Sequence, residues 1–166
     1  MVERQVIIMK NKNKGFTLAE LLIVVAIIGV LVAISIPIFS KQLEKSRDAV
    51  SVANIRSAYA EAQAEYITCE FSDNQMDDKV HNKTIKDKNG KLIMNVNFRN
   101  GSIYQICVMN VELKGKVQNS WSGMGNNLPF PVNDDHVAGK WMVVFYYDPD
   151  GNLNKATING MPSSAL

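Results

Sequence analysis

The stretch that decides the fold lies at residues 15–39 and reads GFTLAELLIVVAIIGVLVAISIPIF. It follows an N-terminal segment whose charged side chains are mostly basic: Arg4, Lys10, Lys12 and Lys14, against Glu3. As an α-helix, residues 16–39 would measure about 36 Å at about 1.5 Å per residue, which is enough to cross a bilayer. Because the basic residues precede the run and none lies within it, the positive-inside rule places the N-terminus in the cytoplasm.

An ordinary secretory signal peptide is not indicated. The apolar run is longer than the core of such a signal, no small-x-small cleavage site occurs at residues 35–39, and helix-forming sequence continues over residues 41–56. The start residue is open, because Met9 serves as well as Met1 and would leave a leader of residues 9–15.

Glu20 is the one ionisable residue between Gly15 and Lys41. A charge inside hydrocarbon costs a few kcal/mol at the bilayer centre and less near an interface. Its carboxylate could therefore snorkel to the membrane surface or be protonated. Alternatively, it awaits a cationic partner that arrives later. The residues by themselves leave both interpretations open.

The sequence from Gly15 to Leu31 resembles the N-terminal signature of type IV prepilins and pseudopilins, the class III prepilin signal peptide. The resemblance covers residues 1–40. It implies cleavage between Gly15 and Phe16 by a membrane-embedded prepilin peptidase, with N-methylation of the new Phe16 amine. It also implies that Glu20 pairs with the N-terminal ammonium of a neighbouring subunit during assembly, since two ions that are each costly in lipid are tolerated together.

Two helix-weakening residues lie inside the apolar run. Pro37 removes one backbone hydrogen bond and crowds the carbonyl of Ala33, which predicts a kink. Gly29 adds backbone freedom of about 1 kcal/mol relative to alanine. An ordinary membrane-helix kink explains both residues. The resemblance implies instead that the stretch loosens in the filament and makes it extensible.

The helical pattern continues beyond the apolar run. An apolar stripe recurs every three or four residues, at Val52, Ile55, Tyr59, Ala62, Tyr66 and Cys69, while charged residues including Glu44 and Asp48 fall off it. We therefore expect one helix of about 55 residues, roughly 80 Å long. The predicted organisation is a leader at residues 1–15, an assembly helix at 16–39, an amphipathic half at 40–71 and a globular head at 72–166.

The head carries strand patterns. Residues 92–98 end at Asn100-Gly101, a strong hairpin signal. Residues 103–113 place an apolar set on one face: Ile103, Cys107, Met109, Val111 and Leu113. Residues 141–147 are apolar on both faces, which predicts a central covered strand, and residues 152–158 follow a turn as an edge strand. Residues 72–90 read as a surface connector and residues 119–135 as an exposed loop. The predicted fold class is α+β, a long N-terminal helix packed on a small antiparallel sheet.

Candidate sites in the head are few. Cys69 ends the helical stripe and Cys107 lies on a strand face that could meet it, so a disulfide and a pair of buried thiols are both open. The sequence at Asp148 suits a plain turn better than a calcium loop, because it lacks the sixth-position glycine and the closing glutamate. The net charge of +2 is not gathered into a basic stripe, so we expect no nucleic-acid partner. We find no catalytic constellation and expect no metal, cofactor or enzymatic activity.

The resemblance implies a structural subunit of a type IV pilus. Such a subunit is held in the cytoplasmic membrane with its N-terminus inside and is cleaved by prepilin peptidase. The assembly machinery then polymerises it with copies of itself into a surface filament for adhesion, aggregation or twitching motility. One alternative is a minor pilin, or a pseudopilin of a type II secretion or competence system. An alternative of another class is a membrane-anchored binding module or enzyme, which would require a pocket of converging polar groups in the head.

Overall fold

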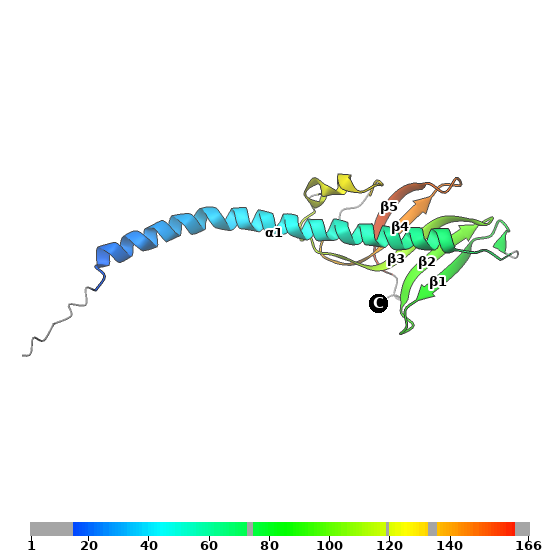
Figure 1. Cartoon of the computed structure of the whole chain (residues 1–166), viewed down its shortest axis with the longest axis horizontal. Coiled ribbons are helices and arrows are strands. Elements are labelled where there is room, and N and C mark those ends of the chain that lie inside the picture. Colours follow the sequence, from blue (N-terminus) through cyan, green and yellow to red (C-terminus); the bar gives the residue numbers. More distant parts are fainter. Residues whose placement is uncertain (1–14, 73–74, 119, 133–135, 162–166) are drawn as a thin grey trace, which may run out of the picture. The chain divides into compact units, whose positions relative to one another are not determined.

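The computed structural model describes residues 15–72, 75–118, 120–132 and 136–161. The chain divides into two compact units, Met1–Ser40 and Lys41–Leu166. A single helix, α1 (Leu18–Thr68), contributes to both units (Figure 1). The predicted long helix is therefore confirmed, with its last helical residue at Thr68 rather than at residue 71. Pro37 lies inside α1 without ending it.

The end of α1 is explained by packing in the head. The Cys69 amide still donates to the Glu65 carbonyl at 2.9 Å, after which the chain leaves the helix. Phe71 then meets Phe98 of the sheet, with ring centroids 4.9 Å apart. An aromatic pair of this kind contributes about 0.5–1.5 kcal/mol beyond its buried area, which favours the change of direction over another helical turn.

The sheet is an antiparallel meander of five strands in the order β1-β2-β3-β4-β5. Their bounds are β1 His81–Lys86, β2 Leu92–Arg99, β3 Ser102–Leu113, β4 Gly139–Tyr147 and β5 Leu153–Asn159. The predicted α+β class is confirmed. So are the hairpin at Asn100 and Gly101, which both have positive φ (52° and 69°), the central position of β4 and the edge position of β5.

Strand β1 was not predicted, and the interpretation of residues 72–90 as a connector was wrong at His81–Lys86. The reason lies in the polar side chains of this strand, which are paired at the partly exposed edge of the head. Lys83 donates to Glu65 of α1 at 2.6 Å, and His81 pairs with Asp77 at 2.5 Å. The alternation of apolar and polar residues that marks a half-buried strand is therefore absent.

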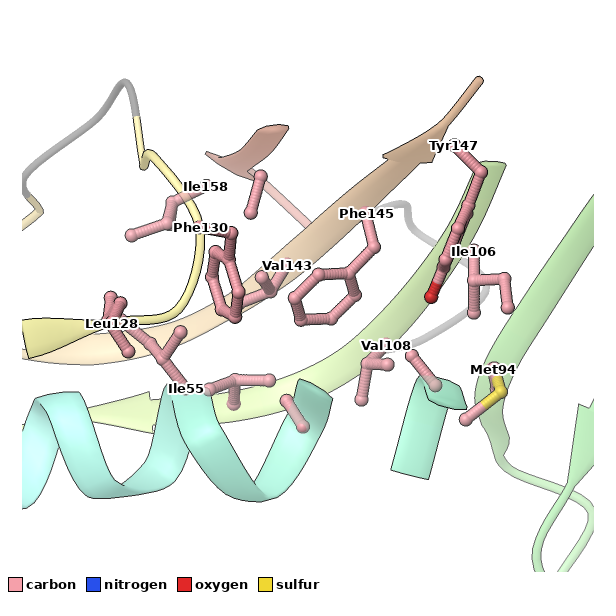
Figure 2. Packing of buried hydrophobic residues seen from close by; sticks show 14 of the residues in the cluster. Ile55, Met94, Ile106, Val108, Leu128, Phe130, Val143, Phe145, Tyr147 and Ile158 are labelled. Carbon is pink, nitrogen blue, oxygen red and sulfur yellow. The ribbon is translucent and has the colours of Figure 1, made fainter. Parts of the chain in front are cut away.

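The main core lies between α1 and one face of the sheet. Figure 2 shows Ile55 pointing from α1 toward side chains that include Val143 of β4 and Val108 of β3. Ile55 is 0% exposed, as are Val143 and Phe145. Burying a side chain of this size contributes about 1.5–3 kcal/mol, so this contact is what holds the amphipathic half of α1 on the sheet.

The connection between β3 and β4 was predicted to be an exposed loop, and this is wrong for its described apolar residues. Trp121, Leu128 and Phe130 are all buried in the main core. The ring of Phe130 lies 4.9 Å from that of Tyr59 of α1 and 5.6 Å from that of Phe145 of β4 (Figure 2). The glycine and asparagine content indicated a loop correctly, but three apolar side chains fold that loop onto the core.

The predicted face of residues 103–113 was also wrong. Two register shifts interrupt β3, one opposite Asn97/Phe98 and one between Val108 and Val111, where Asn110 has a φ of 59°. Each shift adds a residue and reverses the alternation of faces. Cys107 and Met109 consequently join a second small cluster with Leu92 and Val144, away from the main core.

The two cysteines do not share a face. Both are free thiols; Cys69 packs against the main core, whereas Cys107 belongs to the second cluster. The expectation that they face each other is therefore corrected, and a disulfide between them is not proposed. Burial raises the pKa of the Cys107 thiol to about 11 and also raises that of Cys69, so both behave as small hydrophobes rather than as reactive thiolates.

A fragment comprising Lys41–Leu166 is expected to be soluble and folded. The main core residues all lie within this unit, and the large exposed apolar surface of residues 16–39 is removed. A near-UV circular dichroism signal that is lost cooperatively on heating would show the fold. An aggregated fragment, or one without a near-UV signal, would contradict the independence of the head.

Candidate functional site

The candidate site begins where the chain enters α1. Gly15, Phe16 and Thr17 precede the first helical residue, and the Phe16 side chain is 89% exposed. No atom lies within 4 Å of a Cβ placed on Gly15. The peptide bond between Gly15 and Phe16 therefore lies in an open, non-helical segment directly before α1.

Thr17 and Glu20 together form a capping box at the start of α1. The Thr17 amide and hydroxyl donate to Glu20 Oε2 at 2.8 and 2.9 Å, and the Glu20 amide donates to Thr17 Oγ1 at 3.2 Å. These bonds satisfy two amides that a helix start leaves without partners, an effect of about 1 kcal/mol. The T-x-x-E spacing was visible in the sequence, and sequence reasoning missed this local role of Glu20.

The surface of α1 between Glu20 and Ser40 is apolar on all sides. Every residue of this stretch is exposed, including the large hydrophobic set Leu21, Leu22, Ile23, Val24, Val25, Ile27, Ile28, Val30, Leu31, Val32, Ile34, Ile36, Ile38 and Phe39. The helix is long and apolar enough to cross a membrane, by length and composition. Such a contiguous apolar surface far exceeds what soluble monomers leave in water. It requires cover by lipid, by protein or by each in turn.

Comparison with known proteins identifies this segment. Residues 10–36 match the family described as the prokaryotic N-terminal methylation motif. Over 48 residues the chain is 50% identical to the type IV major pilin protein PilA of Myxococcus xanthus, a match that covers 29% of this chain and 22% of that protein. Over 61 residues it is 43% identical to the type IV major fimbrial protein FimA of Dichelobacter nodosus, covering 37% and 36%. Over its N-terminal residues the chain is thus similar to type IV major pilin and fimbrial proteins.

The similarity is concentrated at the N-terminus of this chain. It spans only 22% of the length of the Myxococcus xanthus protein and 36% of that of the Dichelobacter nodosus protein. A longer match, to a fimbrial protein of Neisseria meningitidis, covers 69% of this chain and 68% of that protein at 28% identity. No solved structure matches the chain.

The head contains an arrangement at the first turns of its part of α1 that sequence reasoning missed. Glu44, Asp48 and Ser51 lie on one face of the helix and bind the segment that follows β3. Asp48 was expected on the polar face, yet it is 0% exposed. The spacing of four and three residues was readable, but the partners lie more than sixty residues away in sequence and gave no local signal.

These three side chains form what we call the loop clamp. Ser51 Oγ accepts from the amides of Lys114 (2.8 Å) and Gly115 (3.3 Å). Glu44 Oε1 accepts from the amides of Lys116 and Val117, the latter at 3.0 Å, and Asp48 Oδ2 accepts from the Ser122 hydroxyl at 2.5 Å. Glu44 and Asp48 accept as charged groups and Ser51 as a neutral one, and together these hydrogen bonds hold the connection between β3 and β4 against the helix.

Gly115 lies against the clamp so closely that a Cβ at this position would collide with Asp48 Oδ1. A side chain here would displace the buried carboxylate or the segment bound to it. The clamp therefore requires glycine at residue 115.

The described part of the head contains no group of three His, Cys, Asp or Glu residues that could hold a metal ion. The turn after β4 is closed by Asp148 itself. Its Oδ1 accepts from the amides of Asp150 at 3.0 Å and Asn152 at 2.8 Å, and these bonds hold the pKa of the Asp148 carboxyl below its usual value. That carboxylate thus has a structural role at the turn.

Proposed function

We propose that this chain is a type IV pilin, a structural subunit of a type IV pilus that polymerises through residues 16–39 into a surface filament. The observation that carries the proposal is the fully exposed apolar helix with one carboxylate, Glu20, inside it. Lipid can cover that surface while the subunit waits in the membrane, and the helices of neighbouring subunits can cover it in a filament. The relatives named as major pilin and fimbrial proteins support this use.

We further propose the sequence of events at the N-terminus. The basic leader holds the N-terminus in the cytoplasm, in keeping with the positive-inside rule. Prepilin peptidase cleaves between Gly15 and Phe16, the new Phe16 amine is methylated, and the assembly machinery then moves the subunit from the cytoplasmic membrane into the filament. The open segment before α1 and the methylation-motif match at residues 10–36 support this order.

Glu20 has two successive roles in this proposal. Before assembly its carboxylate caps the start of its own helix through Thr17. During assembly it receives the Phe16 ammonium of a neighbouring subunit, so that neither ion remains unpaired in an apolar bundle. Because the pair forms only in one alignment of the two helices, it sets their register.

Gly29 and Pro37 are proposed to let the assembly helix yield. Pro37 lacks the amide hydrogen that a helix interior requires. The Ser35 hydroxyl donates to the Leu31 carbonyl at 2.6 Å, a back-bonding arrangement that often bends a helix. The segment around Pro37 is therefore the place where α1 can loosen most easily, which would make the filament extensible.

The N-terminus of the assembled protein tests the proposal directly. Protein sheared from the cell surface is expected to have the mass of residues 16–166 plus one methyl group. A major pilus subunit should be the main component of that sheared material. A minor pilin or a pseudopilin would be a trace component or absent from it, and a product that begins beyond residue 39 would contradict the assignment of the leader and the assembly helix.

A further inference from the structure

The charges of α1 in the head follow an order that the helix dipole does not explain. Lys41, Lys45 and Arg47 lie close together, with Glu44 and Asp48 beside them. Arg56 follows, Glu61 and Glu65 lie near the C-terminal end, and the last turn has no basic residue. A helix C-terminus favours cations, so this end carries the less favourable sign. The basic cluster at residues 41–47 lies in the interior of α1, away from both helix ends, so the helix dipole does not account for it.

Two more lysines join this cluster from a distant part of the sequence. The loop clamp binds the backbone of Lys114 through Ser51 and that of Lys116 through Glu44, which places both residues beside the first turns of the head helix. We call Lys41, Lys45, Arg47, Lys114 and Lys116 the basic collar. Four of the five are exposed and Arg47 is partly exposed.

The acidic residues near the collar are largely committed to other partners. Glu44 accepts from loop amides and from Arg47 at 3.3 Å, and Glu112 pairs with Lys114 at 2.5 Å. Asp48 is buried beneath the loop. Within the described part of the chain, Lys41, Lys45 and Lys116 form no ion pair. The collar thus presents an excess of positive charge to its surroundings.

Apolar side chains accompany these cations. Leu43, Val50 and Val117 are exposed to 41%, 42% and 55%. An open groove of about 610 Å³ lies between the helix and the segment after β3. Its lining combines three cations of the collar, the carboxylate paired with one of them, and small or apolar residues: Arg47, Lys114, Lys116, Glu112, Ser46, Val50, Leu113, Ala138 and Gly139. Cations bordering an apolar floor suit a phosphodiester whose glycerol and acyl carbons lie against the floor, and a mixture of basic and apolar side chains is typical of surfaces that lie on anionic membranes.

We propose that the basic collar binds the headgroups of anionic phospholipids while the subunit is held in the membrane, and so docks the head on the bilayer surface. The inference rests on the proposed membrane stage of the pilin. Lys41 directly follows the apolar run in the same helix, which brings the collar to the lipid headgroups as soon as that run spans the bilayer. Each lysine or arginine near an anionic surface contributes about a fivefold preference for it.

The position of the collar supports a dedicated ligand. Basic residues that flank a membrane span are usually in excess on the cytoplasmic side, and here the proposed topology puts the collar on the opposite side. Removal of the leader would take away Arg4, Lys10, Lys12 and Lys14 and leave the collar as the main basic cluster beside the span. Anionic headgroups of the outer leaflet are the partner that this charge fits.

The test uses the full chain in lipid nanodiscs of phosphatidylcholine alone, or of phosphatidylcholine and phosphatidylglycerol in equal parts. A lipid with a spin-labelled headgroup broadens the amide signals of residues close to the surface. We expect broadening at residues 114–117 only with phosphatidylglycerol, and its loss at high salt. Lys45→Gln combined with Lys116→Gln should lower the docked-to-free ratio on the order of 20-fold, because two of the charges are removed.

The matched control is Lys88→Gln combined with Lys91→Gln, which removes two exposed lysines near the turn between β1 and β2 and should leave the broadening unchanged. Equal broadening in both lipid compositions, or equal effects of the two double variants, would overturn the proposal. Broadening that instead rises with the number of subunits per nanodisc would assign the collar to a second copy of the chain and would also overturn it. The assay needs membrane insertion but no filament, so its outcome is independent of the filament proposal.

Discussion

Replacing Glu20 with alanine is expected to reduce the number of surface filaments by on the order of 100-fold or more while leaving the subunit in the membrane. The incoming Phe16 ammonium would enter an apolar helix bundle without a carboxylate, and breaking such a buried pair costs about 3–5 kcal/mol. Insertion should be unchanged or improved, because the desolvation cost of Glu20 disappears. Counting filaments by electron microscopy, with processed subunit quantified in the membrane fraction, measures both effects.

The capping box supplies the controls that separate assembly from helix capping. Glu20→Gln keeps a side chain that can cap through Thr17 but has no charge, so filaments should still fail. Thr17→Val removes the hydroxyl of the same capping box and retains the carboxylate, so filaments should persist at a cost of about 1 kcal/mol to the start of the helix. Normal filaments from Glu20→Ala as the sole subunit, or equal losses from Thr17→Val and Glu20→Gln, would show that capping is the role of Glu20.

The N-terminal half of the fold was predictable because its signal is long and local. The apolar run needs no tertiary partner to be recognised, and the stripe through Val52, Ile55 and Ala62 repeats often enough to fix the buried face of the helix. All three of these residues are buried. Periodicity over many residues is the most reliable sequence signal for a helix, and it was sufficient here.

The face of β3 could not be predicted by the same reasoning. Asn110 takes a positive φ and adds a residue to the strand, so Met109 and Val111 point to opposite faces although strict alternation puts them together. A bulge depends on the pairing of two strands, and the sequence of one strand does not reveal it. The two register shifts that flank Cys107 thus reversed its assignment relative to Ile103 and Val111 and, with it, the expected meeting of the cysteines.

The loop clamp could not be predicted either, because its partners are distant in sequence. Asp48 was placed on the polar face because a carboxylate is usually solvated. It is buried because Ser122 and the segment after β3 fold over it. Ser122 follows Asp48 by 74 residues in the sequence. A charge can be assigned to solvent from local sequence only when no distant segment supplies hydrogen-bond donors for it.

Replacing Ile55 with alanine is expected to destabilise the head by about 2–5 kcal/mol, the usual cost of removing a large buried side chain. Ile55 of α1 is 0% exposed and packs among side chains of β3, β4 and the β3–β4 connection (Figure 2). The cavity would remove the contact that holds the helix on the sheet. Thermal unfolding of the full chain in a mild detergent, followed by the near-UV signal, should show a melting temperature lower by about 10 °C or more.

Ile67→Ala is the matched control, since it makes the same substitution in the same helix at a side chain that is 80% exposed. Its effect should lie within about 0.5 kcal/mol, because little buried contact is lost and alanine is a better helix former. Comparable destabilisation by the two variants would mean that α1 is held by something other than the packing of Ile55. Insertion of Ile55→Ala into membranes should remain normal, because residues 16–39 carry that property and the head core contributes nothing to it. A variant that inserts normally with a loosened head would therefore separate the two physical tasks of this chain, anchoring through the apolar helix and folding through the amphipathic one.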